Sequence, residues 1–178
     1  MQLRSLLIFS LRVFGFAPRQ FNRWAASRLP RICVLFYMNE MLRSEVDVIY
    51  RVSPSLTNDE LNALFVAAWQ GHSWRDFNSV LNRSLAFICA YHKERLVGFV
   101  NLVWDGGYHT FILDTTVHKE LRRRGIGLEL VRRASIEAES CGAEWLHVDF
   151  EPHLQSFYEQ CGFRHTAAGL IKLRSRSV

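Results

Sequence analysis

Apolar and polar residues alternate along several short segments of the chain and recur at helical spacing in others. Val46, Val48, Tyr50 and Val52 share one face of a segment, which predicts a strand over residues 46–52. Further apolar runs predict strands over residues 85–91, 96–104, 109–117 and 144–150. Two short segments, 163–165 and 170–174, predict strands that close the domain.

Other segments have the pattern of helices. Thr57, followed by Glu60 three residues later, forms a capping box that predicts a helix over residues 57–69. Helices are also predicted over residues 74–83, 128–141 and 154–161. Turns are expected at the charged segment His92–Arg95 and at Asp105–Gly107. The resulting order, β-α-α-β-β-β-α-β-α-β-β, predicts a mixed α/β fold.

Composition and charge divide the chain into two parts. Its 178 residues fit one domain with an appendage, and 49% of them are apolar, enough for a packed core. Residues 1–45 contain seven arginines against Glu40 and Glu45. The chain has 22 basic and 17 acidic residues, so residues 46–178 hold 15 of each. A neutral domain argues against a nucleic-acid partner.

Residues 1–45 are predicted to be a basic, apolar extension of a domain at 46–178. Their best apolar run, Ser5–Leu11, is bounded by Arg4 and Arg12, which argues against a signal peptide. They contain no uncharged stretch of the length that a membrane-spanning helix needs. The favoured interpretation is a helix that packs on the domain or on a partner subunit of a homodimer. A basic amphipathic helix lying on a membrane, or a native start at Met38 or Met41, are the open alternatives.

The four cysteines give no sign of a metal or a disulfide framework. Cys33, Cys89, Cys141 and Cys161 form no CxxC pair and have no histidine cluster near them. Their spacing also differs from that of a small disulfide-rich domain. We therefore expect reduced thiols, a cytoplasmic location and no metal.

The stretch RRRGIG, residues 122–127, lies between a predicted strand and a predicted helix. Glycines let the backbone approach a ligand closely, a helix start carries partial positive charge, and arginines suit phosphate. The lysine of a P-loop is missing. Leu130 replaces the third glycine of a Rossmann turn, and the charged segment 118–124 separates the glycines from the strand. The pattern predicts a pyrophosphate site built mostly from backbone groups.

RRRGIG resembles the (Q/R)xxGx(G/A) coenzyme A loop of the GNAT N-acetyltransferase superfamily, and FYEQCGF at residues 157–163 resembles the second signature of that family. The resemblance covers residues 46–173 and implies a largely antiparallel sheet with one splayed parallel strand pair. It also implies acetyl-CoA as co-substrate and direct attack on its thioester by a primary amine of a small molecule or peptide. The alternative is a non-catalytic GNAT-like module that binds acyl-CoA as a sensor or interaction domain.

The resemblance assigns roles to particular residues. Contacts to the coenzyme would come from Thr115, Thr116, Val117, Arg122, Arg123, Arg124, Gly125, Ile126 and Gly127. Tyr158 matches the family's tyrosine acid, and a phenol with a reference pKa of about 10 stays protonated at neutral pH. Glu151 stands where the family often has asparagine, and it is a candidate general base together with Asp114.

Tryptophans mark the candidate acceptor pocket. In the family this pocket is built by the first two helices and the strands that follow them. Trp69 and Trp74 flank the loop between the two predicted helices, and Trp104 lies beside the hairpin turn. Aromatic rings can wall an amine pocket through cation–π contacts. They can equally cover the hydrophobic core, and both interpretations stay open.

Overall fold

The structure, a computed structural model, describes residues 47–173. The extension predicted over residues 1–45, including Cys33, lies outside the described residues, so its role and the boundary at residue 46 stay predictions. No helix among the described residues is long and apolar enough to cross a membrane.

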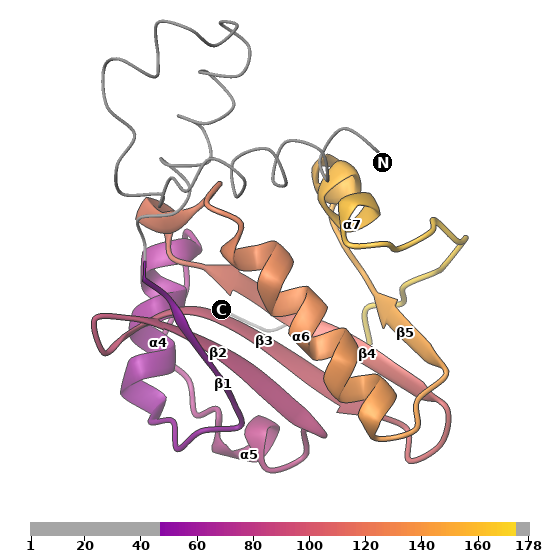
Figure 1. Cartoon of the computed structure of the whole chain (residues 1–178), viewed down its shortest axis with the longest axis horizontal. Helices are drawn as coiled ribbons and strands as arrows, with labels where there is room; N and C mark the ends of the chain where they lie inside the picture. Colours follow the sequence, from indigo (N-terminus) through magenta and orange to yellow (C-terminus); the bar gives the residue numbers. More distant parts are fainter. Residues whose placement is uncertain (1–46, 174–178) are drawn as a thin grey trace, which may run out of the picture. The chain divides into compact units, whose positions relative to one another are not determined.

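A single five-stranded sheet forms the centre of the described fold (Figure 1). Its strands, in spatial and sequence order, are β1 (Ile49–Val52), β2 (Ala86–His92), β3 (Arg95–Trp104), β4 (His109–Val117) and β5 (Trp145–Val148). Neighbouring strands are antiparallel except for β4 and β5, which are parallel. The predicted fold class, a largely antiparallel mixed sheet with one parallel pair, is confirmed.

Within residues 47–173, four α-helices and two short 3-10 helices lie between these strands or after the last of them. They are α4 (Asn58–Ala68), α5 (Asn78–Leu81), η2 (Lys119–Leu121), α6 (Ile126–Ser140), η3 (Pro152–Leu154) and α7 (Gln155–Gln160). The predicted capping box opens α4. The N–H of Glu60 donates to Oγ1 of Thr57 at 3.2 Å, and the N–H of Thr57 donates to Oε2 of Glu60 at 2.9 Å.

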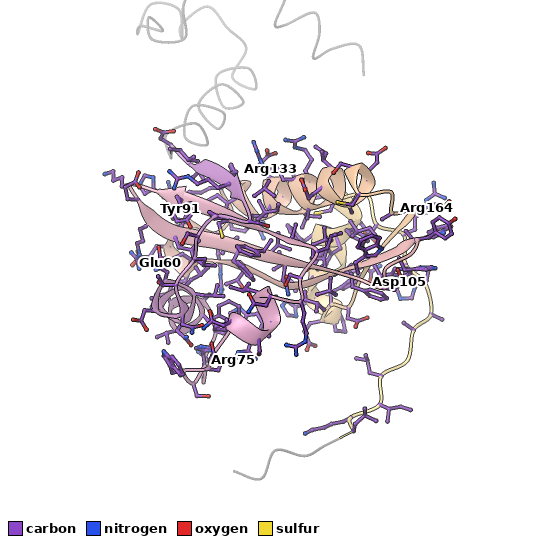
Figure 2. The ribbon with its side chains drawn as sticks, turned by 90° about the horizontal axis from the view of Figure 1, so that it is seen from below. Glu60, Arg75, Tyr91, Asp105, Arg133 and Arg164 are labelled. Carbon is purple, nitrogen blue, oxygen red and sulfur yellow. The ribbon has the colours of Figure 1, made fainter. Side chains whose placement is uncertain are left out.

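The sheet separates two apolar clusters. Figure 2 shows α6 on one face of the sheet and α4 with α5 on the other. Leu130 and Val131 of α6 are fully buried against one face, in the same cluster as Tyr158. Phe65 of α4 and Phe99 of β3 are buried on the opposite face. The positions of β4 and of the loops at its end are thus fixed from both sides.

The prediction of two closing strands is wrong for the described residues. Residues 163–173 form neither helix nor strand, and Leu170, Ile171 and Leu173 are more than four-fifths exposed. A strand requires a hydrogen-bonding partner, which a local apolar pattern does not supply. The second helix is also shorter than predicted, because residues 74–77 belong to the loop before α5.

Candidate active site

The parallel pair β4–β5 ends partway along β4. Its ladder stops where Ile112 lies opposite Val148, the last residue of β5. β4 continues to Val117, whereas the chain after β5 turns away toward α7 (Figure 1). Residues 113–117 therefore have no strand partner on the β5 side within the described part of the chain. The predicted splay of the two strands is present, and it leaves backbone groups of β4 facing a gap.

The amide of Val117 is directed into this gap. The N–H of His118 donates to the carbonyl oxygen of Val97 on β3 at 2.8 Å. Successive N–H groups of a strand point to opposite sides, so the N–H of Val117 points away from β3. The neighbouring Thr116 is buried and donates its hydroxyl to the carbonyl oxygen of Asp114 at 2.9 Å. The end of β4 thus offers a backbone donor at the gap.

The start of α6 offers three further donors. Gly125 is its N-cap residue and has a left-handed backbone with φ of +83°, which glycine adopts without strain. The N–H of Glu129 makes the first intrahelical bond, to the carbonyl oxygen of Gly125 at 3.0 Å. The N–H groups of Ile126, Gly127 and Leu128 precede it and lack a helical acceptor. Free N–H groups at the positive end of a helix form a site for an anion.

The arginines of the loop differ in their surroundings. All three side chains are exposed. Arg122 donates from Nη2 to the carbonyl oxygen of Ala68 at 2.6 Å and from Nε to that of Val117 at 3.3 Å. Its guanidinium is therefore directed at protein carbonyls rather than at open solvent. Arg123 and Arg124 directly precede Gly125 and add positive charge beside the free N–H groups.

Gly127 brings the two sequence motifs together. A Cβ atom at this position would lie 3.3 Å from Cε2 and Cζ of Phe157 on α7, and 3.6 Å from Cγ2 of Val117. Because glycine has no Cβ, the start of α6 can lie against both the second motif and the end of β4. The spacing of RRRGIG and FYEQCGF in the sequence could not show this contact.

Tyr158 follows Phe157 on α7 and is only 5% exposed. Its ring stacks on Phe150 with centroids 4.9 Å apart, and Phe163 meets it edge-on at 5.7 Å. Burial raises the pKa of the Tyr158 phenol above 10.0, and the nearby hydroxyl of Thr115 opposes this shift. The Thr115 hydroxyl is itself buried and has no hydrogen-bond partner among the described residues. The phenol is therefore neutral at neutral pH and lies beside β4.

Asp114 occupies a bulge in β4. Its φ is +54°, and the register between β3 and β4 shifts at this point. Burial raises the pKa of the Asp114 carboxyl above 3.8, and the positive charge of Arg75 opposes the shift. Bulges beside active sites often redirect a side chain. This bulge places a partly buried carboxylate on the strand that borders the gap.

Glu151, the other candidate base, lies in a different environment. It follows β5 and directly precedes Pro152 at the start of η3. Its side chain is exposed to solvent. The two candidate bases therefore come from the two chain segments that diverge at the gap. Asp114 is the more enclosed of them.

Asn101 on β3 was not predicted from the sequence. It is fully buried opposite Leu113 of β4, and neither atom of its amide group has a hydrogen-bond partner among the described residues. An unsatisfied buried polar group costs about 1–3 kcal/mol, so it requires an explanation. The available signal was a polar residue in the middle of the apolar run LVGFVNLVW.

The three predicted acceptor tryptophans do not come together. Trp69 and Trp74 lie in the loop after α4 and are 43% and 63% exposed, and the ring of Trp69 lies 5.1 Å from that of Phe65. Trp104 of β3 lies opposite Thr110 of β4, and Thr110 is seven residues before Val117, the last residue of β4. At about 3.3 Å per strand residue, this is roughly 23 Å from the end of β4. Nε1 of Trp104 donates to the carbonyl oxygen of Gly107 at 2.8 Å, a bond within the turn that joins β3 to β4.

Two asparagines of α4, also not predicted, hold the loop that contains Trp69 and Trp74. Nδ2 of Asn62 donates to the carbonyl oxygen of Arg75 at 2.9 Å, and its Oδ1 accepts from the N–H of Arg75 at 3.1 Å. Oδ1 of Asn58 accepts from the N–H of Phe77 at 2.8 Å. The loop also lines a pocket of about 220 Å³. Its backbone is therefore anchored while one tryptophan stays largely exposed.

These features fit an acyl-coenzyme A. The free N–H groups of α6 suit a pyrophosphate, the open edge of β4 suits an extended amide-containing arm, and a neutral phenol lies beside that edge. No group of three or more histidine, cysteine, aspartate or glutamate side chains within residues 47–173 could hold a metal ion.

Several solved structures share this fold. A GNAT family acetyltransferase from Streptococcus pneumoniae has a TM-score of 0.61 and 22% identity, covering 73% of this chain and 99% of its own. The aminoglycoside N-acetyltransferase AAC(6')-Iy, in complex with CoA, has a TM-score of 0.59 and 20% identity, with coverage of 74% and 97%. Glucosamine-6-phosphate N-acetyltransferase from Arabidopsis thaliana has a TM-score of 0.56 and 12% identity, with coverage of 71% and 99%.

Sequence comparison gives the family directly. No curated protein matches the chain. The model of the acetyltransferase (GNAT) family matches residues 54–163, which is more than half of the chain and contains both motifs. The chain therefore belongs to the acetyltransferase (GNAT) family.

Proposed function

We propose that the protein transfers an acetyl group from acetyl-CoA to a primary amine of a small molecule or peptide. The observation that carries this proposal is the contact of Gly127 with Phe157 beside the gap between β4 and β5. It brings an anion-binding helix start, an open strand edge and a buried tyrosine to one place. A module that only bound the coenzyme would have no need of the neutral phenol at this edge.

The coenzyme would be held mainly by backbone groups. The N–H groups of Ile126, Gly127 and Leu128 would receive the pyrophosphate, with Arg123 and Arg124 adding charge. The open edge of β4 at residues 115–117 would pair with the extended arm of the coenzyme. Its bound thioester supplies the acyl group for transfer.

Two groups would stabilise the reacting atoms. The N–H of Val117 points into the gap, where it can donate to the oxyanion that forms when the amine attacks the thioester carbonyl. Tyr158 would then give its phenolic proton to the departing thiolate. Burial raises the pKa of Tyr158, so the phenol carries its proton at neutral pH and has it available to donate.

A base must remove a proton from the attacking amine, because only the neutral amine has a free lone pair. We assign this role to Asp114 in preference to Glu151. Its carboxyl is partly buried and has a raised pKa, which makes it a stronger base than an ordinary aspartate. The exposed Glu151 would instead attract a cationic acceptor to the gap.

We expect Asp114→Asn to lower kcat/KM by at least about tenfold, since a positioned base contributes this much or more. Asparagine tolerates the left-handed backbone of this bulge. A raised folded-state pKa means that the ionised carboxylate destabilises the fold as pH rises through that pKa. The variant should therefore melt at a higher temperature than the parent at neutral pH. The gain should vanish below pH 3.8, the ordinary pKa of the group.

The control for this prediction is Asp149→Asn, which removes an exposed carboxylate after β5 and should leave both activity and the melting temperature unchanged. Rates and thermal melts across about pH 3 to 9 measure both effects, because the melts must reach below 3.8, the ordinary pKa of this carboxyl. A larger loss of activity in Glu151→Gln than in Asp114→Asn would transfer the role of base to Glu151.

The acceptor is the part of the proposal that the fold leaves unspecified. Proteins with this fold include one that acetylates aminoglycosides and one that acetylates glucosamine 6-phosphate. An amine panel of polyamines, amino acids, aminoglycosides and peptides, with detection of the released thiol, tests the function. Amine-dependent thiol release supports it. Binding of acetyl-CoA without release for any amine in such a panel would favour the sensor or interaction module.

A further inference from the structure

Arg122 connects three parts of the site through one guanidinium group. It belongs to the coenzyme loop, and its Nη2 donates to the carbonyl oxygen of Ala68 at 2.6 Å, 54 positions away in the sequence. Its Nε donates to the carbonyl oxygen of Val117 at 3.3 Å. Ala68 is the last residue of α4, and Val117 is the last residue of β4.

The bond from Arg122 gives a carbonyl group at the C-terminus of α4 a hydrogen-bond donor. The last carbonyl groups of a helix have no partner in the helix and carry partial negative charge. α4 has no basic residue in its own last turn. Among the described residues, Arg122 supplies this charge from the coenzyme loop. Its planar fork can donate to two carbonyl oxygens at once, which lysine cannot do in the same way.

The bond lies at the start of the acceptor-side loop, residues 69–77. Asn58 and Asn62 hold the second half of this loop through the backbone of Arg75 and Phe77. Its first residue, Trp69, is joined to α4 by its N–H, which donates to the carbonyl oxygen of Phe65 at 2.8 Å. The position of Ala68 therefore sets the direction in which the loop leaves α4.

We propose that Arg122 is a positioning residue that couples the coenzyme loop to the acceptor-side loop. Binding of the coenzyme at the start of α6 restricts the backbone of Arg122. This restriction lowers the entropy lost when its guanidinium bonds to Ala68, so the end of α4 and residues 69–77 become more ordered. By linkage, an ordered acceptor-side loop raises the affinity for the coenzyme by the same factor. The inference rests on the proposed function, since it requires a coenzyme at this loop.

Hydrogen exchange of the amides in residues 69–77, with and without coenzyme A, tests the coupling in the full chain. We expect coenzyme A to slow this exchange by roughly fivefold or more in the parent. In Arg122→Gln the slowing should disappear, while coenzyme A still binds. Arg83→Gln is the matched control, because Arg83 makes the same kind of bond, from Nη1 to the carbonyl oxygen of Ser79 at 2.7 Å, on α5. It should keep the slowing.

The outcomes separate this inference from the proposed function. If the parent does not bind coenzyme A, both fail. If the parent binds it and the slowing persists in Arg122→Gln, the coupling is overturned and the proposed function stands. If Arg122→Gln no longer binds coenzyme A at all, the guanidinium holds the coenzyme itself, and the coupling role is again overturned. If the bond from Arg122 to Ala68 were only structural, Arg122→Gln would change the hydrogen exchange of residues 69–77 equally with and without coenzyme A.

Discussion

Replacing Gly125 with glutamate is expected to abolish the stabilisation of the protein by acetyl-CoA. In the parent, a ligand at 100 times its Kd should add about 2.7 kcal/mol to the free energy of unfolding. For a domain of this size this corresponds to a rise in melting temperature of roughly 5 to 10 °C. A Cβ atom at Gly125 would meet no protein atom within 4 Å, so a glutamate side chain fits there, next to the N–H groups proposed to hold the pyrophosphate. Its carboxylate would repel the pyrophosphate.

Gly142→Glu is the matched control for this experiment. Gly142 lies just beyond the other end of α6 and has φ of +90°, close to the +83° of Gly125, and a Cβ atom there would also meet no protein atom within 4 Å. Both variants carry the same left-handed strain, about 1–2 kcal/mol, and the same added charge. Gly142→Glu should therefore melt lower without ligand but keep its shift with acetyl-CoA. A full shift in Gly125→Glu would show that the coenzyme does not bind at the start of α6.

The sequence predicted the elements whose evidence is local. The capping box at Thr57, the turn at Asp105–Gly107 and the β4 strand all lie where the pattern indicated. RRRGIG predicted an anion site because its signal, glycine before an amphipathic helix, is contained in a few residues. The structure gives a different reason for each of the two glycines in RRRGIG. Gly125 needs a left-handed backbone, whereas Gly127 needs room for Phe157.

The features that the sequence did not predict depend on contacts between distant residues. Nothing local indicates that the guanidinium of Arg122 bonds to Ala68, or that Asn62 holds the backbone of Arg75. The prediction of closing strands over residues 163–165 and 170–174 was wrong for the same reason. The apolar run that includes Leu170 and Ile171 has a strand pattern, but pairing depends on a neighbour that the pattern does not name.

Tyr158→Phe is expected to lower kcat by about 100-fold, the lower end of what a positioned general acid contributes. Phenylalanine keeps the ring contacts with Phe150 and Phe163 and removes only the hydroxyl. The affinity for acetyl-CoA should therefore change little. In the parent, burial raises the pKa of Tyr158, so kcat should fall only at alkaline pH, as the phenol loses its proton. The variant should lack this alkaline decrease.

Tyr91→Phe is the matched control, because Tyr91 is 6% exposed against 5% for Tyr158 and its phenol pKa is also raised by burial. Tyr91 packs in the cluster on the α4 side of the sheet, among residues such as Phe65 and Phe99. Loss of a buried hydroxyl there should leave kcat and its pH profile unchanged. Thiol release with an acceptor from the amine panel measures both variants. If kcat is equal in Tyr158→Phe and the parent, the departing thiolate takes its proton from another donor, and burial of Tyr158 serves packing alone.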